Sequence, residues 1–286
     1  MIKVFRVDTA EVYKSPVTEV AIKTWKFPGG EVGVQLEFLP VITDPETQGY
    51  VIYWSFESNE ELFLVANIKD AIESQTDCSV SLILPYVPYA RQDRVCNEGE
   101  SFALRVFAQM LNALDFSEIT CYDVHSEVSE RMIKNLEVLH QAVCSADLPK
   151  YDYVIAPDAG AAKKIYKMRQ VNDIENPTKV IVLSKTRRDG RVIYNDLESG
   201  TIPETAKICV VDDISDGNGT FVALGEMLAK TGNKGYQLDL YVTHGIFSKG
   251  LDNLRENYNK VYTSHLMNKE VRNDRMLVEL LRPIGV

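Results

Sequence analysis

Short apolar segments alternate with amphipathic ones along most of this chain, and this alternation limits the fold more than any other feature. The apolar runs have the length of buried strands: Tyr50–Trp54, Val80–Leu84, Ile119–Asp123, Tyr153–Ala156, Val180–Leu183, Ile208–Val211 and Leu238–Thr243. The segments with helical periodicity are Glu60–Ile72, Ser101–Leu114, Ser126–Asn135, Ala161–Lys167, Phe221–Lys230 and Leu251–Asn257. Strands and helices in alternation are typical of parallel sheets covered by helices, so the sequence predicts an α/β fold.

The beginning of the chain has a different pattern. Apolar side chains recur at every second position at Val32, Val34, Leu36 and Phe38, which predicts an antiparallel edge or hairpin. Further on, the polar segment Ser145–Pro149 precedes a new strand, and 286 residues are enough for two domains. We therefore predict two similar domains, residues 1–140 and 141–286, with the last residues able to pack back on the first domain.

Composition and charge disfavour several classes of protein. A net charge of −10 argues against a nucleic-acid binder, which needs a basic surface. The five cysteines show no metal-binding spacing and are expected to be reduced. No apolar run is long enough to cross a bilayer, and no signal peptide is recognisable. We therefore expect a cytoplasmic protein that acts on small molecules.

The segment Cys209–Thr220, with sequence CVVDDISDGNGT, has the residues needed to hold a phosphorylated sugar. Asp212 and Asp213 follow an apolar strand, and a glycine-bearing loop then leads into a helix. Backbone N–H groups at such a helix start bind anions, whereas carboxylates bind sugar hydroxyls or a cation. The order suits a ribose phosphate, although helix capping and turn formation alone also account for these residues.

More polar segments follow the predicted strands, where α/β sheets bind ligands. They are Pro85–Arg94, which carries arginines suited to phosphate; Asp123–Ser126, with His125; Ala156–Gly160, with Asp158; and Ser184–Arg191, basic and of the composition of a mobile flap. Each also has an ordinary structural interpretation. In the same order, these are a stiff loop, a structural histidine, a turn and a solvated hairpin. Their order along the chain is therefore more informative than any one of them.

That order resembles the ribose-phosphate pyrophosphokinase family, the phosphoribosyl diphosphate synthetases. The matching pieces are Phe27–Glu31, Tyr89–Arg94, Asp123–His125, Pro157–Gly160, Lys185–Arg187, Val211–Thr220 and Thr243–Ser248. The resemblance implies two type I phosphoribosyltransferase-like domains, each a mostly parallel sheet flanked by helices, with the active site between them. It also implies a Mg²⁺-dependent transfer of the β,γ-diphosphate of ATP to the anomeric hydroxyl of a ribose 5-phosphate group, releasing AMP.

The resemblance also implies roles for individual residues. Lys185 and Arg187 would be catalytic residues on the flap. ATP would be bound by Phe27, Glu31, Arg91, Gln92, Asp93 and Arg94, the first two coming from a neighbouring subunit. His125 and Asp158 would hold Mg²⁺. Asp212 and Asp213 would bind the ribose hydroxyls, and Asp216, Gly217, Asn218, Gly219 and Thr220 the 5-phosphate.

Departures from the family pattern leave the acceptor open. Gly217 and Asn218 stand where a threonine and a small residue are usual, which removes a hydroxyl and leaves room. ADP-ribose is therefore an alternative acceptor to ribose 5-phosphate. A missing first helix and the short spacing from His125 to Asp158 favour a homodimer over larger homo-oligomers, and Gly29, where the family has an acid, bears on adenine selectivity. A type I phosphoribosyltransferase and a non-catalytic regulatory paralogue are the rival functions.

Overall fold

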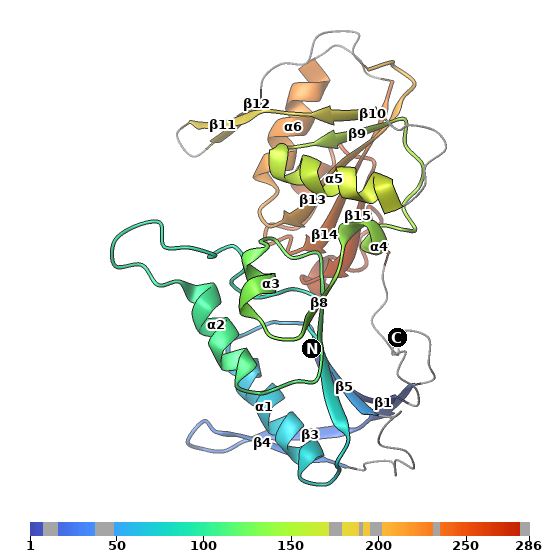
Figure 1. Cartoon of the computed structure of the whole chain (residues 1–286). Helices are drawn as coiled ribbons and strands as arrows, with labels where there is room; N and C mark the ends of the chain where they lie inside the picture. The colour runs from blue at the N-terminus through green and yellow to red at the C-terminus, as the bar shows by residue number, and fades with distance from the viewer. Residues whose placement is uncertain are drawn as a thin grey trace. The chain divides into compact units, whose positions relative to one another are not determined.

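The structure is a computed structural model, which describes residues 1–7, 17–37, 49–171, 179–188, 191–194, 202–230 and 235–280. The described residues form two compact units, Met1–Leu139 and the part that starts at His140 (Figure 1). This division lies one residue before the predicted one. The predicted return of the chain end to the first domain concerns residues 281–286, which are outside the described residues.

The first unit is built on a six-stranded sheet in the order β2-β1-β5-β6-β7-β8. Its strands are β1 (Ile2–Val7), β2 (Val17–Val20), β5 (Gly49–Trp54), β6 (Ser79–Ile83), β7 (Ile119–Tyr122) and β8 (Leu136–Leu139). Strand β1 is antiparallel to both β2 and β5, whereas β5 to β8 are parallel. The helices are α1 (Glu60–Glu73), α2 (Ala103–Asn112) and α3 (Val128–Met132).

Alternation along β5 explains how this sheet is buried on both faces. Tyr50, Ile52 and Trp54 belong to the large core that also contains Val65 of α1 and Leu104 of α2. Val51 and Tyr53 point the other way and join a smaller core with Phe5 and Ile83. Because successive residues of a strand face opposite sides, a continuous apolar run is what a strand covered on both faces requires.

A separate antiparallel hairpin, β3 (Ile22–Lys26) with β4 (Val32–Leu36), accompanies the first unit. It agrees with the predicted period-two pattern, although Phe38 lies outside the described residues. Val34 and Ile22 pack against the large core of the unit. The hairpin therefore has one side on the core, while its tip remains exposed.

The second unit has an all-parallel sheet in the order β10-β9-β13-β14-β15-β16. Its strands are β9 (Tyr153–Ala156), β10 (Lys179–Val182), β13 (Lys207–Ser215), β14 (Gln237–Gly245), β15 (Lys260–Leu266) and β16 (Leu277–Glu279); β11 (Lys185–Arg188) and β12 (Arg191–Tyr194) form a hairpin. The helices are α4 (Gln141–Cys144), α5 (Ala159–Val171) and α6 (Gly219–Lys230), with 3-10 turns at Asp252–Leu254 and Lys269–Val271.

Strand β13 shows why α5 and α6 cover opposite faces of this sheet. Ile208 and Val210 pack in a core with Leu224 of α6, whereas Cys209 and Val211 pack with Ile165 of α5.

The chain runs from β9 outward to β10 and then returns past β9 to β13, so the direction of strand order reverses between β9 and β13. Ligands of open α/β sheets bind at such a switch point, beyond the carboxyl ends of the strands.

Several predicted boundaries were wrong for identifiable reasons. The predicted helix Ser126–Asn135 ends at Met132, because Ile133 is extended and Asn135, directly before β8, has a φ of 55°. The predicted helix Leu251–Asn257 is a single 3-10 turn, because Asn259 bonds Leu238 in β14 through both its N–H, at 2.7 Å, and its side chain, at 2.9 Å. The strand predicted to end at Val211 continues to Ser215, paired with β14 throughout.

Two expectations from composition have structural counterparts. The five cysteines are all free thiols, and only Cys96 is exposed. Over the ranges described above, no helix has the length and apolarity that crossing a membrane would require.

Candidate functional site

Three carboxylates meet the switch point of the second unit. Strand β9 pairs with β13 as far as Ile155 opposite Val210, and β9 ends one residue later. Beyond Val210, β13 is paired only with β14, so the edge that carries Asp212 and Asp213 faces the turn after β9. Asp158 lies in that turn. The register therefore brings Asp158, Asp212 and Asp213 to one end of two neighbouring strands, as the sequence predicted for strand-end residues.

Local contacts hold each of these carboxylates in place. An oxygen of Asp158 accepts a hydrogen bond from the backbone N–H of Ala161 at 3.0 Å, which caps α5. Asp213 is buried and forms an ion pair of 3.0 Å with the Nζ atom of Lys164. Asp212 accepts a hydrogen bond of 2.9 Å from the backbone N–H of Asp213. Lys164 offsets part of the acidic charge, so the group is fixed before any ligand binds.

The glycine-bearing loop after β13 is braced from inside by Asn218. Its side chain accepts a hydrogen bond of 2.7 Å from the hydroxyl of Ser215 and donates to Gly250 at 2.8 Å and Asn253 at 2.7 Å. Asn218 is only 2% exposed and has a φ of 63°, a conformation that asparagine tolerates better than most residues. Any contact of Asn218 with a ligand must therefore come from its backbone.

The predicted motif Thr243–Ser248 supports the same loop. The backbone N–H groups of Ile246 and Phe247 both donate to the carbonyl of Ser215, at 2.9 and 3.0 Å, and the hydroxyl of Ser248 donates to Asp216 at 2.7 Å. Phe247 is fully buried with a φ of 44°, a strained conformation for a bulky residue. Such strain persists only where surrounding contacts impose it, and here those contacts shape the loop.

The loop ends at the N-terminus of α6, which begins at Gly219. The first N–H groups of a helix have no partner within the helix and attract anions. The stem of Lys249 runs beside the loop, since its Cε atom would lie 3.5 Å from a Cβ atom added at Gly217. Sequence reasoning missed Lys249, although its position directly after Thr243–Ser248 was a usable signal. The loop thus combines helix amides with an exposed cation.

The predicted flap is a hairpin in the structure. Lys185 pairs with Tyr194 and Arg187 pairs with Val192 across β11 and β12. Strand β12 contacts α6, and Tyr194 is buried in the core of the second unit. The hairpin is therefore anchored at the end where Lys185 lies, while the catalytic roles of Lys185 and Arg187 stay predictions.

In the first unit, a segment predicted to bind ATP lies beside the segment predicted to hold Mg²⁺. The loop that follows β6 contacts the end of β7, because the backbone N–H of Tyr122 donates to Pro85 at 2.9 Å. The hydroxyl of Ser126 donates to Asp93 at 2.7 Å, which ties the segment of His125 to that of Asp93. Among the predicted site residues of these loops, the exposed side chains are those of Arg91, Gln92, Arg94 and His125.

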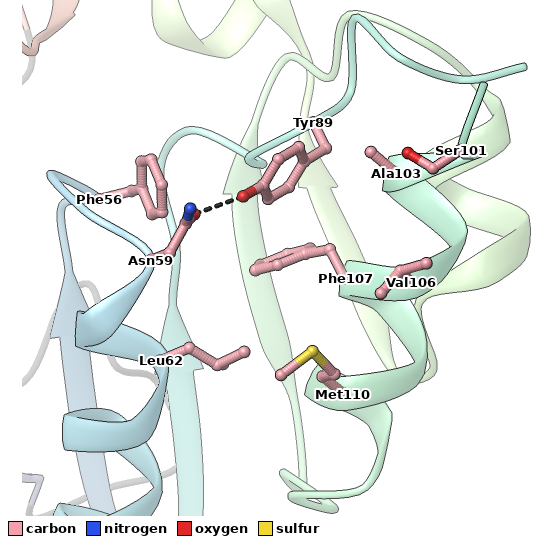
Figure 2. A pocket seen from close by; sticks show the side chains of 9 residues that line it. All are labelled: Phe56, Asn59, Leu62, Tyr89, Ser101, Ala103, Val106, Phe107 and Met110. Atoms are coloured by element: carbon pink, nitrogen blue, oxygen red, sulfur yellow. Dashed lines mark hydrogen bonds between the residues drawn. The ribbon is translucent and has the colours of Figure 1, made fainter. Parts of the chain in front are cut away.

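An apolar cavity of about 310 Å³ lies beside this loop, between α1 and α2 (Figure 2). Tyr89, which has a φ of 63°, closes one side, its hydroxyl donates to Asn59, and its ring lies 5.7 Å from that of Phe107. The lining is otherwise mostly apolar: Phe56, Leu62, Ala103, Val106, Phe107 and Met110, with Ser101 at the rim. Because Arg91 and Gln92 come just after Tyr89 and Ala90, the strained backbone at Tyr89 helps to set where these two side chains leave the loop.

Phe27 and Glu31 occupy the tip of the β3–β4 hairpin. The backbone N–H of Phe27 donates to Glu31 at 2.7 Å, and the Phe27 ring is 49% exposed with an edge contact of 6.0 Å to Trp25. An exposed aromatic pair on a rigid tip suits contact with another chain. Their predicted role at the ATP site of a neighbouring subunit remains a prediction.

The residues predicted to hold Mg²⁺ lie one in each unit. His125 follows β7 in the first unit, and Asp158 follows β9 in the second. Within the described ranges, no group of three or more His, Cys, Asp or Glu side chains is arranged to hold a metal ion. Mg²⁺ commonly uses one or two carboxylates together with water and substrate phosphates. Asp158 therefore fits an ion that arrives with the substrate, and the role of His125 stays a prediction.

Comparison with known proteins finds similarity to the ribose-phosphate pyrophosphokinases. Residues 8–114 match the N-terminal domain of ribose phosphate pyrophosphokinase. Over 247 residues the chain is 26% identical to the ribose-phosphate pyrophosphokinase of Pyrococcus furiosus, covering 83% of this chain and 81% of that protein. Over 206 residues it is 28% identical to that of Mycoplasmopsis pulmonis, covering 69% of this chain and 62% of that protein.

A solved structure shows the same fold. The phosphoribosylpyrophosphate synthetase from Mycobacterium smegmatis has a TM-score of 0.71 at 20% identity, covering 92% of this chain and 87% of that chain. Together the comparisons confirm the predicted resemblance, the α/β fold class and an enzyme of the diphosphokinase type. They leave the individual site residues, the acceptor and the assembly as predictions.

Proposed function

We propose that this chain, a relative of the ribose-phosphate pyrophosphokinases in sequence and in fold, transfers the β,γ-diphosphate of ATP to the anomeric hydroxyl of a ribose 5-phosphate group. AMP is the second product. The observation that carries the proposal is the second unit's combination of an acidic switch point with a braced anion loop that starts α6. Carboxylates for hydroxyls and helix amides for a phosphate match the two ends of a ribose phosphate.

The acceptor is bound by the second unit in this proposal. Asp212 and Asp213 accept hydrogen bonds from the ribose hydroxyls, and the ion pair with Lys164 orients Asp213. The 5-phosphate lies on the backbone N–H groups between Asp216 and Thr220. Lys249 adds a positive charge beside Gly217.

ATP is bound by exposed side chains of the first unit. Arg91 and Arg94 suit the phosphates, because a guanidinium offers paired donors to phosphate oxygens. Gln92 and Asp93 are polar contacts on the same loop, which Ser126 holds against the segment of His125. The hairpin tip at Phe27 and Glu31 supports a homodimer or larger homo-oligomer in which a second chain completes the adenine site.

The reaction needs positioning and charge neutralisation more than a strong base. The anomeric oxygen forms a bond to the β-phosphorus of ATP, the bond from that phosphorus to the oxygen bridging the α-phosphate breaks, and that oxygen leaves with AMP. The proton of the attacking hydroxyl passes to water. Lys185 and Arg187 neutralise the oxygens of the transferring group.

Mg²⁺, when bound, offsets negative charge on the ATP phosphates and orients them. Asp158 is the residue of the second unit that would hold the hydrated ion, and His125 that of the first. The hydrogen bond by which Asp158 caps α5 keeps the Asp158 carboxylate at the strand end whether or not the ion is present.

ADP-ribose is the second candidate acceptor, and Gly217 is the specific observation in its favour. The loop has no side chain at this position, and an added Cβ atom would meet nothing closer than the Lys249 stem at 3.5 Å. A 5-phosphate that continues into a second phosphate needs such room, and Lys249 can pair with its additional charge.

One assay tests the proposal and its rivals. Purified protein receives ATP and Mg²⁺ with ribose 5-phosphate, with ADP-ribose or with no acceptor, and AMP release is followed. AMP release that depends on an acceptor supports a diphosphokinase and identifies the preferred acceptor. A phosphoribosyltransferase would instead consume phosphoribosyl diphosphate without ATP. A regulatory paralogue would be inactive in every arm. Either result refutes the proposal.

A further inference from the structure

Gln141 is a buried polar residue at the point where the chain enters the second unit. It begins α4, and only His140 separates it from the end of β8. Its side chain is 3% exposed. The Nε2 atom donates a hydrogen bond of 3.0 Å to the backbone carbonyl of Asp212 and a longer one, of 3.5 Å, to the hydroxyl of Thr243. The side chain thus joins α4 to the strands β13 and β14.

The bond to Asp212 acts on the peptide group that links the two acidic residues. Gln141 holds the carbonyl oxygen of that peptide, and an oxygen of the Asp212 carboxylate accepts from its N–H, which belongs to Asp213, at 2.9 Å. A peptide group is planar, so holding both of its ends restricts how the two residues that it links can turn. Strand β9 gives no support at this level, because its pairing with β13 ends at Val210.

Helix α4 is itself tied to the sheet, which makes Gln141 a firm support. A helix of four residues is not stable alone and depends on its contacts. The hydroxyl of Ser264 in β15 donates to the carbonyl of Cys144 in α4 and shares a hydrogen bond of 3.0 Å with Tyr241 in β14. The hydroxyl of Ser145 donates to the carbonyl of Gln141 at 2.7 Å. All of these residues are buried, and a buried hydrogen-bond network favours one arrangement over others.

We infer that Gln141 is a positioning residue for the acceptor: by holding the carbonyl of Asp212, it sets the orientation of the two carboxylates on which the ribosyl group binds. The inference deepens the proposed function and rests on it. Gln141 is buried, whereas Asp212 is partly exposed, so Gln141 acts through Asp212 and not on the acceptor itself. Hydrogen bonds weaken steeply when their angles change, so a small turn of this peptide weakens the binding of the ribose hydroxyls.

Gln141→Met tests the inference, because methionine has nearly the same length but no donor. The KM for the preferred acceptor should rise about fivefold, the worth of roughly one hydrogen bond, with the KM for ATP unchanged. The kcat at saturating acceptor should change less than this KM. The rise in melting temperature that the acceptor causes in the wild type should shrink in parallel, a readout that needs no turnover.

Ser145→Ala is the matched control, because it removes buried hydrogen bonds within the same segment, to the carbonyls of Gln141 and Ala142. It should lower the melting temperature of the ligand-free protein as much as Gln141→Met does, but leave the KM for the acceptor within about twofold. If Ser145→Ala raises that KM as much as Gln141→Met, a general loosening of α4 is the cause and the inference is overturned. A Gln141→Met enzyme with a normal KM for the acceptor also overturns it.

Gln141→Asn is a second variant for the case in which Gln141→Met does not fold. It keeps the polar amide but is one methylene shorter, so the bond to Asp212 is lost while the site stays polar. The KM for the acceptor should again rise, with the KM for ATP unchanged. A folded Gln141→Asn protein that binds the acceptor normally overturns the inference.

Failure of the proposed function looks different from failure of the inference. If the wild type releases no AMP with either acceptor, the reaction is wrong. If the wild type is active and the Gln141 variants have its acceptor kinetics, the reaction stands and only the role of Gln141 falls.

Discussion

The two units present their functional residues in opposite ways. In the first unit, Arg91, Gln92 and His125 are exposed on loops. In the second unit, Asp213 and Asn218 are buried and held by ion pairing or hydrogen bonds. Long, solvated side chains adapt to a flexible nucleotide, whereas fixed groups select one geometry. If the second unit binds the sugar phosphate, as we propose, the groups that select it are in place before the acceptor arrives.

Backbone strain occurs in the predicted site segments of both units. The described non-glycine residues with positive φ include Tyr89, Asp123, Asn218 and Phe247. All four lie in segments predicted to be functional from their place after strands. In the second unit, the strain at Asn218 and Phe247 is supported by side-chain and backbone hydrogen bonds to Ser215. Strain at functional sites persists when neighbouring contacts determine it, which is the arrangement seen in the loop.

The largest expected effect is on the flap of the second unit. Lys185→Ala and Arg187→Ala should each lower kcat about 100-fold with little change in the KM for ATP. Contacts made mainly in the transition state are worth on the order of 3 kcal/mol. Steady-state kinetics with saturating acceptor provide the measurement. Arg188→Ala removes the same charge from the same strand and serves as the control; equal losses in all three variants would point to general electrostatics.

A stability comparison tests the contrast between the units directly. Asn218→Gly keeps a residue that tolerates positive φ but removes the bonds to Ser215, Gly250 and Asn253, so the free energy of unfolding should fall by about 2 kcal/mol. Ser126→Ala removes the bond to Asp93 in the first unit and should reduce it by about 1 kcal/mol. Urea denaturation measures both. Equal losses would remove the basis for calling the second unit's loop preorganised.

Much of the fold was predictable because it depends on local pattern. Apolar runs predicted the strands that are buried on both faces, such as β5 and β13. Strand β15 was missed because Thr263, Ser264 and His265 interrupt its apolar pattern, yet all three are buried. Their burial is possible because partners come from elsewhere in the chain: the hydroxyl of Thr263 donates to Thr243 at 3.3 Å, and that of Ser264 bonds Tyr241.

For the candidate site as well, local sequence patterns carried the prediction, whereas contacts between residues distant in sequence could not be predicted. The acidic pair, the loop and the flap were predicted from sequence because each follows an apolar run. The pairing of Lys164 with Asp213 and the hydrogen bond from Gln141 to the acidic strand end could not, since they depend on residues far apart in sequence meeting in space. The inward orientation of the Asn218 side chain was also unpredictable. Because that side chain is held inside the loop, Gly217 and Lys249 are the residues to test for the choice of acceptor.

Gly217→Thr tests that choice with a smaller expected effect. The new side chain meets the Lys249 stem at an ordinary distance, 3.5 Å from its Cβ atom, so the loop should keep its shape. The hydroxyl offers a donor to a terminal phosphate, and the ratio of kcat/KM for ribose 5-phosphate to that for ADP-ribose should rise about tenfold. Gly217→Val adds the same bulk without the hydroxyl. If Val shifts the ratio as much as Thr, room and not hydrogen bonding sets the preference.

The smallest effects are expected at the residues proposed to hold Mg²⁺, and they should differ between the units. Asp158→Asn keeps an oxygen to cap α5 but removes the charge, so the Mg²⁺ concentration for half-maximal rate should rise about fivefold. His125→Ala, on an exposed loop, should raise it only about twofold, because contacts of solvated groups contribute little. His140→Ala removes another exposed histidine and should leave the Mg²⁺ dependence unchanged.

Rates measured across a Mg²⁺ titration at fixed ATP decide the order of these effects. A larger effect at His125 than at Asp158 would reverse the contrast between an adaptable first unit and a fixed second one, and an unchanged dependence in both would return His125 to a structural role.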